Sequence, residues 1–268
     1  CNIRCRWCDT PDSLVKPDVP QGDIQRFVLK GAKAFPGTER DVWVYIPKQL
    51  DRARPARLIV FQDGGGFADR NGGYRAPAVL DNLIARGDIP PLVGIMVSPG
   101  VVPPTDPKGQ LPRYNRSVEY DGVDGRYAGF LTDEVIPEVA RRTGLRFSAD
   151  PADRAVAGSS SGGIAAFTAA WFRPDSFGKA IGFISSFTDL RGGNWYPPVI
   201  RKTERKPIRV FLQEGLNDQD IYSGSWPIGN SDVVAALRFS GYDHRYVTGP
   251  GGHDGRQGSA VLPAALRL

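Results

Sequence analysis

Residues 158–162 constrain the fold of this chain more than any other stretch. Their sequence is Gly-Ser-Ser-Ser-Gly, and they stand between an apolar run at 155–157 and a second apolar run that begins at Gly163. This order predicts a short strand, a tight turn and a helix, a context in which the central Ser160 would be exposed as a nucleophile. Flanking glycines suit a turn with strained backbone angles and close contact between strand and helix. A flexible serine–glycine turn is the alternative that these five residues alone leave open.

The small number of histidines favours the nucleophile over the flexible turn. The sequence holds two, His244 and His253, and a nucleophilic serine needs an imidazole base to accept its proton. His253 lies in the glycine-rich segment 248–255, directly after a short strand, where it could reach over the end of a sheet. His244 comes before that strand, so we expect it to be a packed or surface residue. His253 is therefore the predicted base.

A carboxylate should follow the preceding strand, because it would orient the imidazole and stabilise it when charged. Three carboxylates occur shortly after the apolar strand at 208–212. Asp218 is the predicted member of the site, since Gly215 allows the chain to turn beyond the end of the strand. Glu214 stands closer to the strand and Asp220 further out, and either could instead be a solvated loop charge.

Apolar runs alternate with helical patterns along most of the chain. Strands are predicted at 57–61, 92–97, 155–157, 180–184, 208–212 and 245–247, and helices at 76–86, 127–143, 163–171 and 233–239. This rhythm predicts a mostly parallel central sheet with helices on both faces. Residues 24–30 and 40–46 instead predict an antiparallel hairpin at the edge of the sheet, because a Pro-Gly turn separates them. We also expect a kink at Pro137 and a terminal helix that includes 263–268.

Length and composition favour one large α/β domain. The chain of 268 residues is long enough for a substantial core and short for two domains. Its hydrophobic content of 41% and charged content of 24% are ordinary for a globular protein. No apolar run approaches the ~20 residues that span a bilayer, so no membrane partner is expected. The net charge of +5 comes from scattered arginines rather than a basic stripe, which argues against nucleic-acid binding.

The start of the chain has a different pattern. All three cysteines lie there, as Cys1, Cys5 and Cys8. Residues 1–11 resemble the iron–sulfur cluster loop of radical-SAM enzymes, especially that of 7-carboxy-7-deazaguanine synthases, and three thiolates at this spacing could hold a cluster. Because the resemblance ends there, we expect residues 1–19 to be a disordered or artefactual lead and residues 20–268 to form the domain. The chain as given has no basic segment followed by an apolar one that would indicate a signal peptide.

The motifs around the serine, aspartate and histidine together resemble a known family. Ser160 in G-S-S-S-G-G, Asp218 in G-L-N-D and His253 in G-G-H-D are similar to the motifs of esterase D and enterochelin-esterase-like α/β-hydrolases. That group also includes feruloyl and acetylxylan esterases and mycolyltransferases. The resemblance extends from about residue 20 onward and includes the F-P-G-T-E-R and Q-D-G-G segments. The order Ser, Asp, His along the chain is the α/β-hydrolase order.

The resemblance implies an α/β-hydrolase fold and a serine carboxylic ester hydrolase that works through an acyl-enzyme, with no metal or other cofactor. It also implies that the backbone N–H groups of Gly65 and Ser161 form the oxyanion hole. The substrate would be an ester of siderophore-lactone, feruloyl or acetyl-carbohydrate type, and the enzyme would be periplasmic or secreted. Many α/β-hydrolases have a His-Gly pair at the oxyanion turn, whereas this chain has Asp63-Gly64, which leaves the backbone donors unaffected.

Basic, polar and aromatic side chains near the predicted site are candidate contacts for the substrate, because loops beyond strand ends usually carry such contacts in sheets of this kind. They are Arg113, Tyr114, Asn115, Arg116, Trp195 and Trp226. Surface or core packing explains each aromatic residue nearly as well. An acyltransferase that uses a sugar acceptor, a non-catalytic hydrolase-like binding module and an N-terminal iron–sulfur function are the alternative hypotheses.

Overall fold

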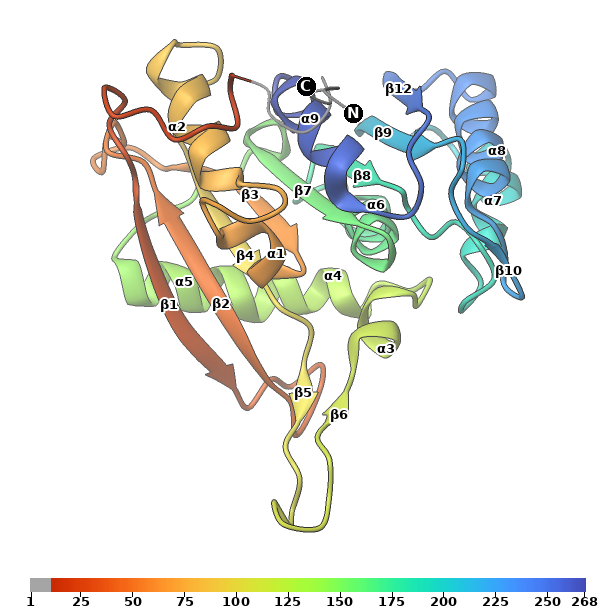
Figure 1. Ribbon diagram of the computed structural model, residues 1–268, viewed down its shortest axis with the longest axis horizontal. Helices are drawn as coiled ribbons and strands as arrows, with labels where there is room; N and C mark the ends of the chain where they lie inside the picture. The colour runs from red at the N-terminus through yellow and green to blue at the C-terminus, as the bar shows by residue number, and fades with distance from the viewer. Residues whose placement is uncertain (1–10) are drawn as a thin grey trace, which may run out of the picture.

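A large sheet runs through residues 11–268, the part of the chain that the computed structural model describes (Figure 1). Its strands are β1 (Asp23–Lys30), β2 (Glu39–Ile46), β3 (Arg57–Gln62), β4 (Leu92–Val97), β5 (Val101–Val102), β6 (Arg113–Tyr114), β7 (Arg154–Ser159), β8 (Lys179–Phe183), β9 (Arg209–Gly215) and β12 (His244–Gly249). Their spatial order is β12-β9-β8-β7-β3-β4-β2-β5-β6, and β1 pairs with β2. A separate small pair is formed by β10 (Asp220–Ile221) and β11 (Gly224–Ser225).

The direction of the strands confirms the predicted topology. Every neighbouring pair from β12 to β4 is parallel. β2 runs antiparallel to β4 and to β1, with Asp23 opposite Ile46 and Lys30 opposite Glu39, so the N-terminal hairpin lies at one side of the parallel strands. The carboxyl ends of parallel strands meet at one edge of a sheet, where sites of this fold class lie. The segments that follow β3, β7, β9 and β12 therefore share that edge.

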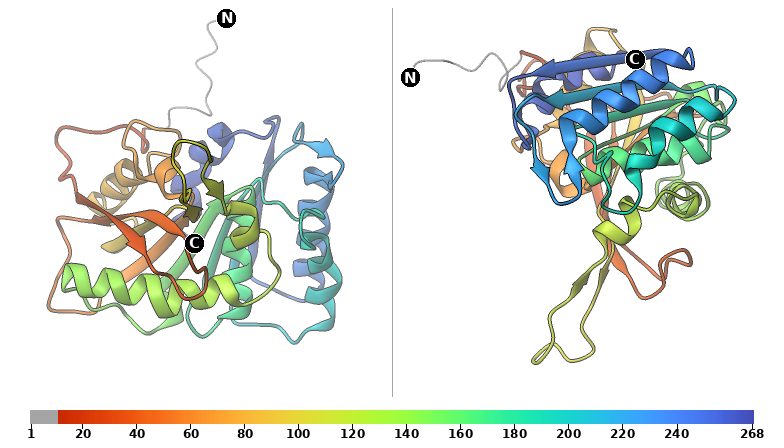
Figure 2. Two further views of the ribbon diagram at one scale, coloured as in Figure 1. Left: turned by 90° about the horizontal axis from the view of Figure 1, so that it is seen from below. Right: turned by 90° about the vertical axis from the view of Figure 1, so that its right-hand side faces the viewer.

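Helices cover both faces of the sheet (Figures 1 and 2). They are α1 (Gly64–Ala68), α2 (Ala76–Ala85), α3 (Arg116–Tyr120), α4 (Arg126–Phe130), α5 (Ile136–Thr143), α6 (Ser161–Phe172), α7 (Tyr196–Lys202), α8 (Trp226–Phe239) and α9 (Gly255–Ala265). On one face α1, α2 and α9 bury Phe67, Leu80 and Leu262. On the other, α4 to α8 bury residues such as Phe130 and Phe167. Two apolar layers thus hold the sheet between them, as the alternation of strands and helices predicts.

Two helical segments differ from their predicted form. The helix expected over 127–143 is divided into α4, a π-helical turn at Leu131–Val135, and α5. The regular pattern changes just before Pro137, which has no N–H to donate. The terminal helix α9 begins at Gly255, well before the predicted segment at 263–268. Asp254 caps it by accepting a 2.9 Å hydrogen bond from the N–H of Arg256, and such a cap sets a helix start.

The proline-rich stretch after β4 forms a hairpin that projects from the body of the molecule (Figures 1 and 2). Its base is held by an ion pair between Arg40 and Glu119, whose side chains are both fully buried. Glu119 also accepts hydrogen bonds from Asn115 Nδ2 at 3.0 Å and from the N–H of Gly100 at 3.2 Å. The amide of Asn115, a predicted substrate contact, is thus engaged within the hairpin base.

Residues 11–19 lie against the ends of α2 and α9. Asn82 Nδ2 donates hydrogen bonds of 2.8 Å to the carbonyls of Asp12 and Leu14, and the Asp12 carboxylate pairs with Arg86 at 2.5 Å and with Arg267 at 3.5 Å. These contacts place residues 11–19 on the surface of the domain, whereas the boundary at residue 20 stays a prediction. The cysteine pattern lies outside the described residues. Among residues 11–268, no helix combines the length and apolar character needed to cross a membrane.

Candidate active site

The serine turn has the strand–turn–helix geometry that its sequence predicts. Ser160 lies between β7 and α6 with φ of 58° and ψ of −124°, a strained conformation for a residue other than glycine. A Cβ on Gly158 would lie 2.1 Å from the carbonyl oxygen of Gly162. One on Gly162 would lie 2.8 Å from Asp63 Oδ2. Gly158 is therefore required for the close approach of the two backbone segments beside Ser160, whereas a side chain at position 162 would displace the Asp63 carboxylate.

The three residues predicted as a triad lie in one chain of hydrogen bonds. Ser160 Oγ lies 2.8 Å from His253 Nε2, and His253 Nδ1 lies 2.7 Å from Asp218 Oδ1. The His253 side chain is 19% exposed and the Asp218 side chain is 0% exposed. With Nδ1–H donating to the carboxylate, Nε2 can accept a proton from the serine hydroxyl. The arrangement can therefore activate a serine oxygen.

The two loops that carry the carboxylate and the imidazole are fastened together. Gly215 and Gly249 end the adjacent parallel strands β9 and β12 at the same level. Asn217 Nδ2 donates a 2.9 Å hydrogen bond to the carbonyl of Pro250. A Cβ on Gly215 would lie 2.3 Å from the carbonyl oxygen of Gly251, so only glycine permits this approach. The register of two neighbouring strands thus determines where the acid and the base meet.

The alternative candidates for the base and the acid, His244, Asp220 and Glu214, do not occupy the positions of His253 and Asp218. His244 begins β12, at the opposite end of that strand from His253, and its Nδ1 lies 2.9 Å from the carbonyl of Tyr242. Asp220 is exposed on β10. The interpretation of Glu214 as a solvated loop charge is wrong, because β9 continues to Gly215 and leaves the Glu214 side chain fully buried.

The surroundings of the site shift the pKa values of Asp218 and Glu214 in opposite directions. Burial alone would raise the pKa of Asp218, but hydrogen bonds from His253 and Glu214 lower it below its ordinary value. Burial raises the pKa of Glu214 to about 9, helped by the hydrogen bond and the charge of Asp218. Asp218 is therefore the more acidic of the two neighbouring carboxyl groups.

The predicted oxyanion donors stand at the first turns of two helices. Gly65 follows the first residue of α1, and Ser161 is the first residue of α6. N–H groups in a first turn have no acceptor within their own helix and carry the positive end of the helix dipole. Asp63, which precedes α1, has a left-handed φ of 56°. The role of these two N–H groups in an oxyanion hole stays a prediction.

Arg116 joins the turn before α1 to the serine turn. Its Nε and Nη2 each donate a 2.7 Å hydrogen bond to Asp63, and Nη2 also lies 3.3 Å from the carbonyl oxygen of Ser159. The N–H of Asp63 in turn donates to the hydroxyl of Tyr120 at 3.1 Å. Burial opposes the charge of Arg116, but Asp63 outweighs it and holds the pKa of the guanidinium above its ordinary value. Arg116, a predicted substrate contact, is thus engaged with the protein itself.

The remaining predicted substrate contacts have different surroundings. Arg113 and Tyr114 form β6 on the projecting hairpin, where both are exposed. Trp195 is 65% exposed, whereas Trp226 is 2% exposed. The Trp226 ring lies 5.3 Å from the His253 ring at an interplanar angle of 78°, so Trp226 supports the imidazole by edge-to-face packing. Binding of substrate by these residues stays a prediction.

Ser186 is a residue of the site that the sequence analysis missed. Its Oγ lies 3.3 Å from Ser160 Oγ, and its N–H donates a 3.1 Å hydrogen bond to the carbonyl of Ser160. It is almost fully buried and follows β8, the strand beside β7. Its position after a strand that neighbours the serine strand is the one sequence signal that could have indicated it.

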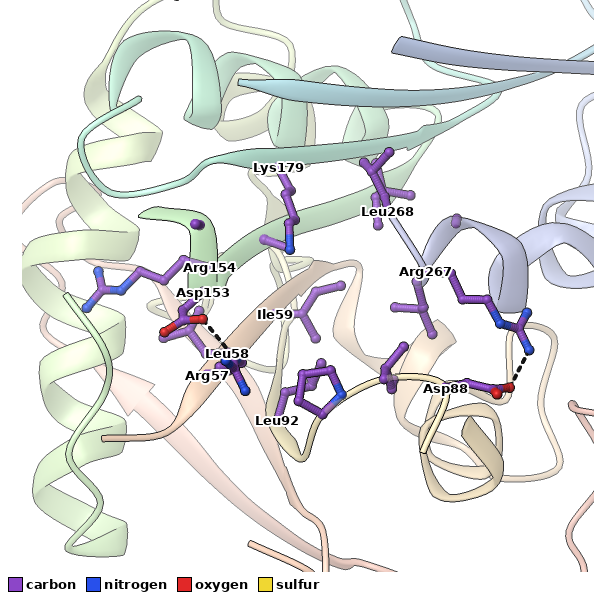
Figure 3. A pocket seen from close by; sticks show the side chains of 17 residues that line it. Arg57, Leu58, Ile59, Asp88, Leu92, Asp153, Arg154, Lys179, Arg267 and Leu268 are labelled. Atoms are coloured by element: carbon purple, nitrogen blue, oxygen red, sulfur yellow. Dashed lines mark hydrogen bonds and ion pairs between the residues drawn. The ribbon is translucent and has the colours of Figure 1, made fainter. Parts of the chain in front are cut away.

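A cavity of about 370 Å³ is lined by residues at the starts of several strands (Figure 3). Arg57 and Lys179, which begin β3 and β8, line it, and Lys179 points toward its interior from β8. Arg57 is paired with Asp153 at 2.6 Å. The cavity thus opens at the amino ends of the strands and does not belong to the candidate site. No cluster of three or more His, Cys, Asp or Glu side chains suited to a metal ion occurs within residues 11–268.

The parallel sheet, with a serine turn after β7 and with acid and imidazole after β9 and β12, defines an α/β-hydrolase. The chain belongs to the Putative esterase family, whose sequence model matches residues 33–257. The predicted family and fold class are thereby confirmed.

Individual relatives agree with this assignment. The chain is 25% identical over 231 residues to the iron(III) enterobactin esterase of Dickeya dadantii (strain 3937), a match that covers 81% of this chain and 48% of the relative. The enterobactin esterase of Shigella flexneri has a similar structure, with a TM-score of 0.71, 21% identity, and coverage of 93% of this chain and 60% of that one. A CE1 ferulic acid esterase of Anaeromyces mucronatus has a TM-score of 0.73 at 17% identity, with coverage of 98% and 96%. The chain thus spans about half of its curated relative, and the structural similarities establish the fold.

Proposed function

We propose that the protein is a serine carboxylic ester hydrolase that works through an acyl-enzyme. The observation that carries the proposal is the continuous relay from Ser160 Oγ through His253 to Asp218, with separations of 2.8 and 2.7 Å. Membership of the Putative esterase family supports the same reaction class. An imidazole held between a serine and a carboxylate is the arrangement that makes a weakly acidic hydroxyl nucleophilic.

In the first half of the proposed reaction, Ser160 Oγ attacks the carbonyl carbon of the ester while His253 Nε2 takes the hydroxyl proton. The carbonyl π electrons move to oxygen, and the N–H groups of Gly65 and Ser161 stabilise the resulting oxyanion. Asp218 stabilises the imidazolium. The tetrahedral intermediate then collapses, the bond to the alcohol oxygen breaks, and His253 gives its proton to the departing alcohol. The acyl group remains on Ser160.

In the second half, His253 takes a proton from a water molecule as the water oxygen attacks the acyl carbon. A second oxyanion forms at the same N–H groups. When it collapses, the bond to Ser160 Oγ breaks, His253 returns the proton to the serine, and a carboxylic acid leaves. The net reaction consumes one water molecule and one ester and needs no cofactor.

A fluorophosphonate that labels activated serines tests the proposal directly. Intact-mass spectrometry of the folded wild type should detect a single adduct, and Ser160→Ala should acquire none. Ser159→Ala is the matched control, because it removes the neighbouring hydroxyl of the same turn and should still be labelled. A folded wild type that acquires no adduct would contradict the proposal and favour a hydrolase-like binding module.

For the substrate we propose an ester of siderophore-lactone, feruloyl or acetyl-carbohydrate type. The support is the similarity to proteins named as an enterobactin esterase and a ferulic acid esterase, and a panel of these three ester types would identify the best one. Product analysis with a carbohydrate acceptor present separates hydrolysis from acyl transfer to a sugar. We also propose a periplasmic or secreted location from the family resemblance, which fractionation of the source cells would test.

A further inference from the structure

Glu214 takes no part in the proposed reaction, although its side chain lies next to the carboxylate of Asp218. We propose that Glu214 is a positioning residue that stays neutral, donates a hydrogen bond to Asp218, and so holds the carboxylate in line with His253. This inference rests on the proposed function, because it assigns a role within the same relay. It concerns a residue that the triad itself does not include.

The hydrogen bonds of the two carboxyl groups leave a place for one proton between them. Glu214 Oε1 accepts a 2.8 Å hydrogen bond from the N–H of Gly215, while its Oε2 is buried with no donor among residues 11–268. Asp218 Oδ1 accepts from His253 and, at 2.6 Å, from the N–H of Gln219, while its Oδ2 is likewise buried without a donor within the described chain. The two side chains lie within hydrogen-bonding range of each other. One proton between them satisfies both remaining oxygens.

The surroundings place that proton on Glu214 rather than on Asp218. Two buried carboxyl groups in contact cannot both be ionised without a large cost. Asp218 has the imidazole of His253 beside it, which favours its anion. Glu214 faces Asp218, the side chain of Asn230 on α8 and, on β12, Tyr246, whose pKa burial and the charge of Glu214 raise to about 12. The negative charge of the pair is thus kept on the side that faces the imidazole.

The pair makes activity sensitive to alkaline pH. When Glu214 loses its proton, near its pKa of about 9, it stops donating to Asp218 and becomes a second buried anion. Repulsion between the two groups then disturbs the contact between Asp218 and His253. The same ionisation acts on stability. Because the folded-state pKa is raised from 4.5, the contribution of Glu214 to folding is complete below that ordinary value and is lost as the pH rises through about 9.

Two substitutions distinguish the effect of the hydrogen-bond donor at position 214 from the effect of side-chain size. Glu214→Gln keeps an N–H donor for Asp218 but cannot ionise, whereas Glu214→Met has similar length and no donor. We expect Glu214→Met to lower kcat by roughly tenfold or more with little change in KM, because a hydrogen bond to a buried charge is lost. Glu214→Gln should restore most of that loss near neutral pH. It should also remove the decline of kcat that we expect for the wild type near pH 9.

Asp220→Asn is the matched control, because it neutralises an exposed carboxylate near the same loop and should keep the wild-type pH profile. Infrared difference spectra of wild type minus Glu214→Gln report the protonation state of Glu214 without an activity measurement. They therefore test the inference even if Glu214→Met does not fold. They should contain the C=O band of a neutral carboxyl group near neutral pH, and this band should vanish near pH 9. Absence of the band, or an unchanged alkaline decline in Glu214→Gln, would overturn the inference. Full turnover by Ser160→Ala would instead overturn the proposed function, while the infrared result would stand.

Discussion

Arg116 makes two parallel hydrogen bonds of 2.7 Å to the carboxylate of Asp63. Asp63 sets the start of α1, next to one predicted oxyanion donor, and the same guanidinium reaches the carbonyl of Ser159 in the strand that leads to Ser160. A planar guanidinium matches a carboxylate in this way with more directional precision than an ammonium group. One side chain from α3 therefore fixes the distance between the two turns that would bind the reacting carbonyl group.

We expect Arg116→Met to lower kcat for a neutral ester by about tenfold or more, because a small displacement of positioned groups is costly in the transition state. KM should change less, since Nε and Nη2 of the guanidinium are engaged with Asp63. Arg116→Lys should restore only part of the rate, because one ammonium cannot replace the forked contact. Steady-state kinetics of the three proteins measure these differences.

Arg26 provides the control for this prediction. It makes the same forked contact with Asp41, at 3.0 and 2.9 Å, on the β1–β2 hairpin, where its side chain is 60% exposed. Arg26→Met should leave kcat unchanged. If Arg116→Met were as active as Arg26→Met, the contact with Asp63 would have no role in catalysis.

Asp218→Asn should lower kcat by roughly 10³–10⁴-fold, because an amide no longer selects the imidazole tautomer that can accept a proton from Ser160. The protein should remain folded, which circular dichroism can check. Asp220→Asn, two positions along the chain and exposed, should retain wild-type turnover. Comparable losses in both variants would mean that Asp218 is not the acid of the relay.

Glu119→Gln should lower the free energy of unfolding by about 3–5 kcal/mol, because it leaves the charge of Arg40 buried without its counter-charge. Glu39→Gln is the comparison, since Glu39 pairs with Lys30 at 2.7 Å with 37% and 64% of the side chains exposed. An exposed pair of this kind contributes about 1 kcal/mol or less. Urea unfolding of both variants measures the difference, and equal effects would contradict the importance of burial.

The serine turn could be predicted from sequence because adjacent residues determine its geometry. Gly158 and Gly162 permit contacts that a Cβ would block, and both are visible in the motif. The meeting of Asp218 and His253 could be anticipated for a different reason. The segments that follow parallel strands lie at one edge of a sheet. The order of strands and loops was therefore enough to predict that Asp218 and His253 lie close together.

Side-chain contacts between distant segments could not be predicted in this way. The contact of Arg116 with Asp63 depends on how α3 is placed beside β3, which no local pattern encodes. The burial of Glu214 depends on how far β9 extends past its apolar run. The start of α9 did have a local signal, the capping residue Asp254 before Gly255. Aspartate is common at the position before a helix, so this start could have been predicted.

Because β12 lies at the end of the strand order, the two halves of the site differ in how easily their supporting strands open. Ser160 is held between the interior strand β7 and α6, whereas His253 follows an outer strand most of whose residues are partly or fully exposed. Outer segments of a sheet exchange their amide hydrogens and open locally at a lower free-energy cost than interior ones. Local opening of β12 would carry the imidazole away from a serine that stays in place. We therefore expect the contact between His253 and Ser160 to be lost by local opening of this edge at a lower free-energy cost than global unfolding of the domain.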